Sequence, residues 1–584
     1  MTVHAIKTLS KSIREYKLQT ILSPLFIALE VLIEVMIPFI TAKLIDSIEA
    51  KSTIAEIGRY GMILALMAVL SLICGALSGH FCAVASSGFA KNLRHDLFYK
   101  VQTYSFSNID KFSTSSLVTR LTTDVTNVQN SFMMIIRTAI RSPMMLAFSV
   151  IMTMRISKKL TLIFLTTIPF LVVGVTFMLK KVMPFFKSIF KKYDALNNSV
   201  QENISGIRAV KSFVREDYEK QKFTKASDDV CDNFTRAEKL MALASPLVQM
   251  AIYVVMLLIS FVGAKTIITS GNTELTVGGL SSVMTYGMQV LMSLMMFTMI
   301  FVMITMSMAS ANRIVEVLDE ESSIQNPEAP VMQVKDGSIS FENVSFSYSE
   351  TAEKKTLENI NLNISSGETV GIIGATGSSK TSLIQLISRL YDVTEGSVKV
   401  GGIDVRNYDV KTLRDSVSVV LQKNVLFSGT VSENLRWGNK DATDEELRRA
   451  CVLAQADEFV SAMPDGYDTM IERGGTNVSG GQKQRLCIAR ALLKKPQILI
   501  LDDSTSAVDT KTDALIRKAF RDEIPDTTKI IIAQRISSVQ EADKIIVLDN
   551  GTINGIGTHE ELIETNEIYR EVFETQTKAG DFDD

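Results

Sequence analysis

The sequence predicts a fold in two parts: an α-helical transmembrane domain with six spans, followed by an α/β P-loop nucleotide-binding domain. Long apolar runs, each sufficient to cross a bilayer, occur only in the first half of the 584 residues. The second half instead contains short apolar strands that alternate with helical patterns, which is typical of a buried parallel sheet. Hydrophobic residues make up 46% of the chain and charged residues 21%, as expected for a part-membrane, part-soluble protein.

Each predicted span is an apolar run of about 20 residues, the length that crosses the hydrocarbon core as a helix. The polar stretches 91–130 and 180–239 are long and rich in lysine and arginine, whereas the other gaps are short. The positive-inside rule places the long stretches, and with them both termini, in the cytoplasm, which predicts a multi-pass protein of the cell membrane. The predicted spans are 21–45, 60–83, 132–154, 160–179, 244–267 and 280–308.

The N-terminal segment is predicted to be a basic amphipathic helix that lies on membrane lipid. Ile6, Leu9 and Ile13 recur at helical spacing with basic residues between them. A solvated, charged terminus is the alternative. The predicted parts of the chain are the interfacial helix 1–18, the transmembrane domain 19–318, a linker 319–336, the nucleotide-binding domain 337–575 and an acidic tail 576–584.

Net charge and cysteine usage argue against several classes of protein. The formal net charge is −3, so the chain lacks the bulk basic character of a nucleic-acid-binding protein, and we expect no nucleic-acid partner. None of the five cysteines stands in a CxxC pair or a cysteine–histidine cluster. A zinc site and a disulfide framework are therefore not expected.

A glycine-rich loop follows a short buried strand and precedes a helix, which is the context of a phosphate-binding P-loop. Its backbone N–H groups and the helix N-terminus attract phosphate, Lys380 can reach the β and γ phosphates, and Thr381 can ligate Mg²⁺. Ser379 replaces the glycine expected before the lysine, so it keeps the N–H group but tolerates fewer backbone angles. The predicted ATP-binding residues of the loop are Gly374, Ala375, Thr376, Gly377, Ser378, Ser379, Lys380, Thr381 and Ser382.

A second apolar strand, 497–501, ends in two carboxylates, Asp502 and Asp503. A carboxylate at the end of a strand beside a P-loop holds Mg²⁺. We therefore predict ATP and Mg²⁺ as cofactors, with Asp502 and Thr381 as metal ligands.

The run Ser479, Gly480, Gly481 and Gln482 opens a helix, where its N–H groups would face a phosphate. Together with the P-loop and the acidic strand end, this run resembles the signature of ATP-binding cassette (ABC) proteins. The resemblance extends over the whole of 337–575 and implies that these four residues contact ATP. It also implies that Tyr348 stacks on adenine, that Gln422 contacts Mg²⁺ and the transmembrane domain, and that 506–509, with Asp509, forms the D-loop.

The transmembrane half resembles the exporters of the same family. Residues 109–124 and 202–211 resemble the two cytoplasmic loops that carry coupling helices, which convert closure of the cassettes into outward opening. The sequence ends after one cassette, so we expect a half-transporter that dimerises.

Three residues depart from the family pattern in one site. Asp503 stands where the family has its catalytic glutamate, Gln534 where it has its switch histidine, and Ser379 where it has a glycine. Aspartate is shorter by a methylene, and glutamine cannot carry charge. Beside an intact signature, this pattern resembles the degenerate-site subunit of heterodimeric bacterial exporters. It implies an ATPase translocase whose main hydrolysis occurs at the site of a partner half-transporter; a slow homodimer and an ATP-gated channel are the alternatives.

Charged residues inside the predicted spans indicate either a cargo site or a structural pair. Glu30 and Glu34 share one helical face in the first span, and Arg137 and Arg141 share one in the third. Unpaired charges in hydrocarbon cost about 2.5–3.5 kcal/mol each, so these groups are expected to face a cavity or one another. A cargo site formed by these charges predicts amphiphilic or cationic, drug-like cargo. Flexible methionines of the sixth span suit the same role or plain helix packing: Met292, Met295 and Met299.

Overall fold

The computed structural model describes residues 3–349, 354–504 and 508–580. The chain divides into two compact units, which we treat separately. One comprises Met1–Gln102 and Thr114–Asp319, and the other comprises Thr103–Ser113 and Glu320–Asp584. Thr103–Ser113, part of the first predicted cytoplasmic loop, therefore belongs to the same unit as the nucleotide-binding domain.

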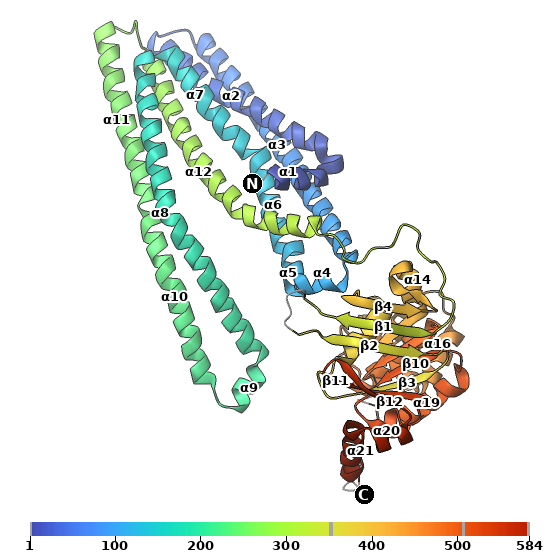
Figure 1. The fold of residues 1–584 in the computed structure, drawn as a ribbon. Helices are drawn as coiled ribbons and strands as arrows, with labels where there is room; N and C mark the ends of the chain where they lie inside the picture. The colour runs from blue at the N-terminus through green and yellow to red at the C-terminus, as the bar shows by residue number, and fades with distance from the viewer. Residues whose placement is uncertain (1–2, 350–353, 505–507, 581–584) are drawn as a thin grey trace. The chain divides into compact units, whose positions relative to one another are not determined.

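In residues 3–102 and 114–319, the regular structure of the first unit is helical (Figure 1). Within the described residues, five helical stretches are long and apolar enough to cross a membrane, and the remaining predicted span, 160–179, lies within α8. The helices are α1 Val3–Ser10, α2 Lys17–Glu49, α3 Ile54–Gln102, α5 Thr114–Thr119, α6 Val125–Ile136, α7 Thr138–Ile156, α8 Lys158–Ser205, α9 Ile207–Ser212, α10 Glu216–Ala242, α11 Ala244–Ser270 and α12 Val277–Asp319.

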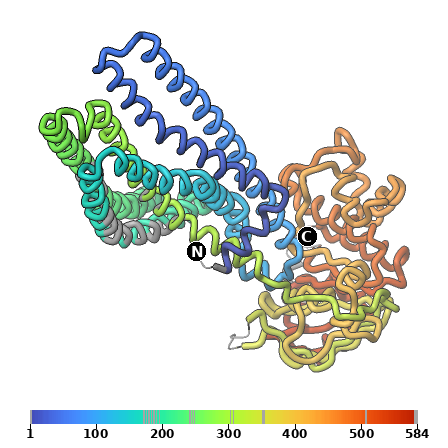
Figure 2. The backbone as a smooth tube through the Cα atoms, turned by 90° about the horizontal axis from the view of Figure 1, so that it is seen from above, coloured from blue at the N-terminus to red at the C-terminus, as the bar shows by residue number. Residues whose placement is uncertain are grey.

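Two pairs of long helices organise this unit. α2 and α3 pack along each other, as both views show (Figures 1 and 2), and α8 and α10 form a hairpin closed by the short helix α9. α12 packs on α2, where the buried hydroxyl of Tyr286 donates a 2.7 Å hydrogen bond to the carbonyl oxygen of Val35.

The N-terminal segment differs from the single helix predicted for 1–18. α1 ends at Ser10, a tighter turn of helix spans Lys11–Tyr16, and Arg14 has a φ of 40°. The Tyr16 ring fills a notch at Gly88 of α3, where an added Cβ would lie 2.3 Å from the ring. The contact between Tyr16 and Gly88, which lie far apart in the sequence, therefore accompanies the break in the helix at Arg14. Helical periodicity alone does not predict this break.

The third predicted span is also interrupted. α6 ends at Ile136 and α7 begins at Thr138, and Arg137 between them has φ −116° and ψ −68°. The break places the two arginines of this span on either side of a helix boundary, since Arg141 lies in the first turn of α7.

The described residues of the second unit form three β-sheets. A six-stranded sheet has the order β12-β11-β3-β10-β9-β6 and is parallel except between β11 and β12. An antiparallel sheet has the order β2-β1-β4-β5, and β7 pairs with β8. The strands are β1 Ile339–Phe346, β2 Leu357–Ile364, β3 Thr369–Ile373, β4 Glu395–Val400, β5 Ile403–Asp404, β6 Val417–Val420, β7 Gly429–Thr430, β8 Met470–Ile471, β9 Ile498–Asp502, β10 Thr528–Ile532, β11 Lys544–Asp549 and β12 Thr552–Gly557.

The parallel register positions the candidate site. Because β10 lies between β3 and β9, with Ile532 opposite both Ile372 and Asp502, the carboxyl ends of these three strands meet at one edge. Helices surround the sheets, and apolar clusters on both faces of the large sheet form the core. The helices are α4 Phe106–Lys111, α13 Lys380–Ile387, α14 Val410–Ser416, α15 Val431–Leu435, α16 Asp444–Leu453, α17 Asp457–Ser461, α18 Gly480–Leu493, α19 Thr510–Glu523, α20 His559–Thr565 and α21 Glu567–Gly580.

Candidate nucleotide-binding site

The predicted P-loop connects β3 to α13 at this strand edge. Gly374 approaches its surroundings so closely that an added Cβ would lie 2.2 Å from the carbonyl oxygen of Leu548. The Lys380 ammonium donates hydrogen bonds to the carbonyl oxygens of Gly374 at 2.7 Å and Ala375 at 2.9 Å. The loop thus brings a cation and a helix N-terminus together, as a phosphate site requires. The exposed members of the loop are Ala375, Thr376 and Gly377, and Ser378 and Ser382 are buried.

Ser379, the predicted departure from glycine, adopts a left-handed backbone with φ 72° and ψ 21°. An L-residue in this region costs about 1–2 kcal/mol relative to its ordinary conformations. Serine therefore occupies a conformation that glycine would adopt without strain, so the loop keeps its shape at the expense of local strain.

Replacing Ser379 with glycine or with alanine should reveal this strain as a difference in stability between the two variants. Ser379→Gly relieves the strain, whereas Ser379→Ala retains it, so we expect the glycine variant to be more stable by about 1 kcal/mol. Thermal unfolding of the purified chain measures the difference. At Ser382, inside α13, the order should reverse, because glycine in a helix is less stable than alanine by about 1 kcal/mol. An alanine variant at Ser379 as stable as the glycine variant would contradict the argument.

The predicted Mg²⁺ ligands lie together beside the loop. The Thr381 hydroxyl donates a 2.9 Å hydrogen bond to the carboxylate of Asp502, which ends β9 and is buried. Burial raises the pKa of Asp502 and lowers the pKa of Lys380, because each charge is poorly solvated there. A hydroxyl and a buried carboxylate form an oxygen donor set that suits Mg²⁺ when phosphate oxygens complete its coordination.

Gln422 and Gln534, predicted at the Q-loop and in place of the switch histidine, both contact Asp503, which stands in place of the catalytic glutamate. Gln534 donates a 2.7 Å hydrogen bond from its amide nitrogen to Oδ2 of Asp503, and Gln422 donates a 3.3 Å bond to the same oxygen. Asp503 itself has a φ of 49°, a second left-handed residue in the site. Two amides therefore donate to one oxygen of the carboxylate that stands in place of the family's base, and neither amide can itself act as a base.

Tyr348 lies beside the P-loop helix with its ring half exposed. Its hydroxyl is 2.9 Å from the hydroxyl of Ser382 and donates a 3.1 Å bond to the amide oxygen of Gln385. An exposed aromatic face held at the first turn of α13 is available for stacking on a base. Gln385 is a further residue of the site that the sequence did not indicate, since nothing distinguishes it from other polar residues of the helix.

The signature residues form the N-terminus of α18. Ser479 and Gln482 form a reciprocal capping box: the Gln482 side chain accepts from the Ser479 N–H at 2.9 Å, and the Ser479 hydroxyl accepts from the Gln482 N–H at 3.3 Å. Gly480 and Gly481 form the first turn. In the described part of the chain no hydrogen bond joins this turn to the P-loop.

Asp509 caps α19, where its side chain accepts a hydrogen bond from the N–H of Thr512. That backbone N–H lowers the pKa of the Asp509 carboxyl, which holds the capping residue ionised. The preceding D-loop positions 505–507 lie outside the described residues.

In the transmembrane unit, both glutamates of the first span pair with one arginine. Arg141 contacts Glu30 at 2.5 Å and Glu34 at 2.6 Å through its two terminal nitrogens. Glu30 is 12% exposed and Glu34 is 32% exposed. Arg137 takes no part in an ion pair within the described residues; its guanidinium instead lies beside Gly79 of α3. The methionines of the candidate cargo surface, Met292, Met295 and Met299, are exposed in this chain.

Comparisons with known proteins identify both halves of the chain. The family "ABC transporter transmembrane region" matches residues 20–310, and the family "ABC transporter" matches residues 357–506. The "Uncharacterized ABC transporter ATP-binding protein YfiB" of Bacillus subtilis is 35% identical over 564 residues, covering 97% of each chain. The "Probable multidrug resistance ABC transporter ATP-binding/permease protein YheI" of the same organism is 33% identical over 571 residues, covering 95% of each.

A solved structure shares the whole fold. The "Structure of a bacterial Atm1-family ABC exporter with ATP bound" superimposes with a TM-score of 0.82 at 23% identity, covering 97% of this chain and 98% of that one. The predicted fold class, a helical transmembrane domain with an α/β P-loop domain, is thereby confirmed. The chain therefore belongs to the ABC transporter family, as a membrane transporter that fuses the transmembrane region to its ATP-binding domain.

Proposed function

We propose that this chain is one half of an ATP-driven exporter and acts in a heterodimer as the subunit with the degenerate P-loop side. The observation that carries the proposal is the pair of amide hydrogen bonds from Gln534 and Gln422 to one oxygen of Asp503. These two donors occupy acceptor sites of Oδ2, so this oxygen is less available to accept a proton from water. The capping box at Ser479, in contrast, gives the signature helix a well-formed N-terminus.

ATP with Mg²⁺ supplies the binding energy and phosphoryl-transfer chemistry of such a cassette. In this chain, Lys380 and the P-loop amides would hold the phosphates, Thr381 and Asp502 would hold the metal, and Tyr348 would support the adenine. Asp503 and Gln534 would be poor at orienting and deprotonating water. The signature turn would complete the nucleotide site of the partner chain, where most hydrolysis would occur.

The cargo is proposed to be amphiphilic or cationic and drug-like. One relative carries the words "multidrug resistance" in its name, and the exposed side chains of Met292, Met295 and Met299 can adapt to varied apolar shapes. The lysine- and arginine-rich loops favour a membrane protein with both termini in the cytoplasm, and the bacterial relatives favour a bacterial cell membrane, across which cargo would move outward.

ATPase measurements test the partnership. The purified chain alone, in lipid nanodiscs, should hydrolyse ATP at least about tenfold more slowly than its complex with a second half-transporter, which corresponds to about 1.4 kcal/mol of barrier. Tagged chain should also copurify that partner. Rapid, cargo-stimulated hydrolysis by a homodimer would contradict the proposal, and single-channel currents gated by ATP would support a channel instead.

A further inference from the structure

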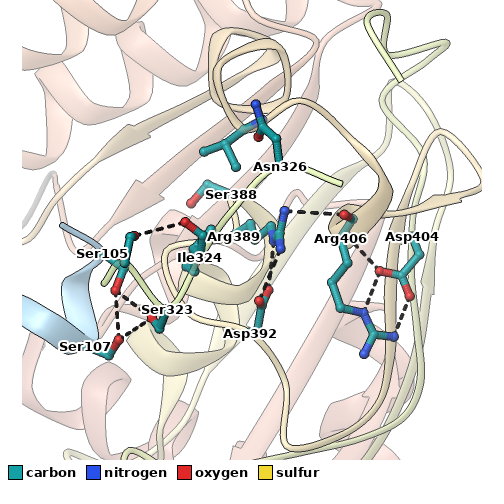
Figure 3. A network of polar contacts seen from close by, with 12 residues as sticks. Ser105, Ser107, Ser323, Ile324, Asn326, Ser388, Arg389, Asp392, Asp404 and Arg406 are labelled. Atoms are coloured by element: carbon teal, nitrogen blue, oxygen red, sulfur yellow. Dashed lines mark hydrogen bonds and ion pairs between the residues drawn. The ribbon is translucent and has the colours of Figure 1, made fainter. Parts of the chain in front are cut away.

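Helix α4 is attached to the segment that leads into the cassette by a cluster of polar contacts. The hydroxyls of Ser105, Ser107 and Ser323 lie within 2.7–2.9 Å of one another (Figure 3). Asn108 donates a 2.9 Å hydrogen bond to the carboxylate of Glu320. These contacts fix one side of α4 but involve no residue of the nucleotide site.

A second attachment joins α4 to the cassette through a single tyrosine. The hydroxyl of Tyr391, which follows α13, donates a 2.5 Å hydrogen bond to Oδ2 of Asp110, and its ring lies 6.0 Å from the ring of Phe106. Burial, reinforced by the Asp110 carboxylate, raises the pKa of Tyr391 above its usual value. The phenol therefore stays protonated at physiological pH and remains a donor to Asp110.

The same ring contacts the tyrosine that borders the adenine position. The ring centroids of Tyr391 and Tyr348 are 5.1 Å apart and the rings are perpendicular, at 89°. Phe346 completes the cluster, with its centroid 4.8 Å from that of Tyr348 and 5.6 Å from that of Tyr391. Edge-to-face contacts of this kind depend on ring orientation, so a constraint on one ring restricts its neighbour.

We propose that Tyr391 is a positioning residue that transmits adenine binding at Tyr348 to helix α4. The proposal rests on the proposed ATP site of this chain. A base stacked on the exposed face of Tyr348 would hold that ring in one orientation. The perpendicular Tyr391 ring would then lose freedom, and its hydroxyl would hold Asp110 more tightly. The coupling is a change in order rather than a large movement, so it should be visible in amide exchange.

Hydrogen exchange of the purified full-length chain in lipid nanodiscs, with and without ATP and Mg²⁺, tests this inference. In the wild type, ATP should slow exchange in peptides that contain the P-loop and also in those that contain α4, the latter by about tenfold. Tyr391→Phe keeps the ring but removes the donor to Asp110. It should leave the protection of the P-loop unchanged and reduce the protection of α4 to less than about threefold.

Tyr467→Phe is the matched control, because the Tyr467 hydroxyl also donates to a carboxylate, that of Asp457, at 2.8 Å. This variant should retain the protection of α4. Equal protection of α4 in the Tyr391 variant and in the wild type would overturn the inference while leaving the ATP site intact. An absence of P-loop protection in the wild type would instead overturn the proposed ATP site, and the inference with it.

Discussion

Gly480→Asp should reduce ATP turnover by the assembled transporter more than about a hundredfold, whereas Asp503→Asn should reduce it less than about threefold. Gly480 begins α18, and a carboxylate there would face the phosphates of the nucleotide bound by the partner chain. An acidic residue in the first turn of a helix stabilises that helix, so the loss should not come from unfolding. Asp503, by contrast, is already engaged by two amides and would contribute little to catalysis.

Steady-state ATPase assays on the two variant complexes, beside melting curves, measure this asymmetry. Unchanged melting temperatures would attribute the loss in the Gly480 variant to the site rather than to the fold. Equal losses of turnover in the two variants would contradict the assignment of this chain as the degenerate side.

Arg141→Met should lower the unfolding free energy of the transmembrane unit by about 3–5 kcal/mol, because it leaves Glu30 and Glu34 without their common partner inside a predicted membrane span. Thermal unfolding in detergent or nanodiscs measures the loss. Arg137→Met is the matched control and should cost much less, since that guanidinium contacts no carboxylate within the described residues. Combining Arg141→Met with glutamine at both glutamates should recover most of the stability.

Transport of a cationic and a neutral dye by Glu34→Gln separates the structural role from cargo binding. Glu34 is the more exposed glutamate, so a cargo site predicts a higher KM for the cationic dye alone. A structural role predicts lower stability and equal losses for both dyes. Unchanged melting and unchanged transport of both dyes would contradict both roles.

The residues predicted for the nucleotide site follow strand ends, and the order of the parallel strands brings them together. Three motifs that end parallel strands meet at one sheet edge, and the contact of Gln534 with Asp503 follows from the neighbouring strands β9 and β10. The restricted backbone expected at Ser379 corresponds to its positive φ. The pairing of the charged residues in the predicted spans could not be predicted in the same way, because it depends on the rotation of each helix about its axis. Periodicity places two arginines on one face, yet Arg141 alone contacts both glutamates, and a helix boundary separates it from Arg137.

The contacts of Tyr391 could not be predicted for a related reason. Its partner Asp110 lies 281 positions away. The resemblance assigns Asp110 to the first cytoplasmic loop but does not indicate which residue of the cassette it contacts. The N-terminal turn at Arg14 likewise depends on the notch that Gly88 provides for Tyr16, which only the packed helices reveal.

The left-handed backbone at Ser379 has a consequence for how such a cassette can evolve. The loop keeps a glycine-like path although its residue is serine, so the path is imposed by the surrounding frame, including the carbonyl of Leu548 against Gly374. The backbone that would bind a nucleotide is therefore held in place independently of the side chains that would hydrolyse it. Substitutions can remove the catalytic side chains one at a time without disturbing the loop, so a site that has lost hydrolysis can still bind nucleotide. Such a binding-only site would keep its geometry through evolution and could come to regulate when an assembly changes conformation.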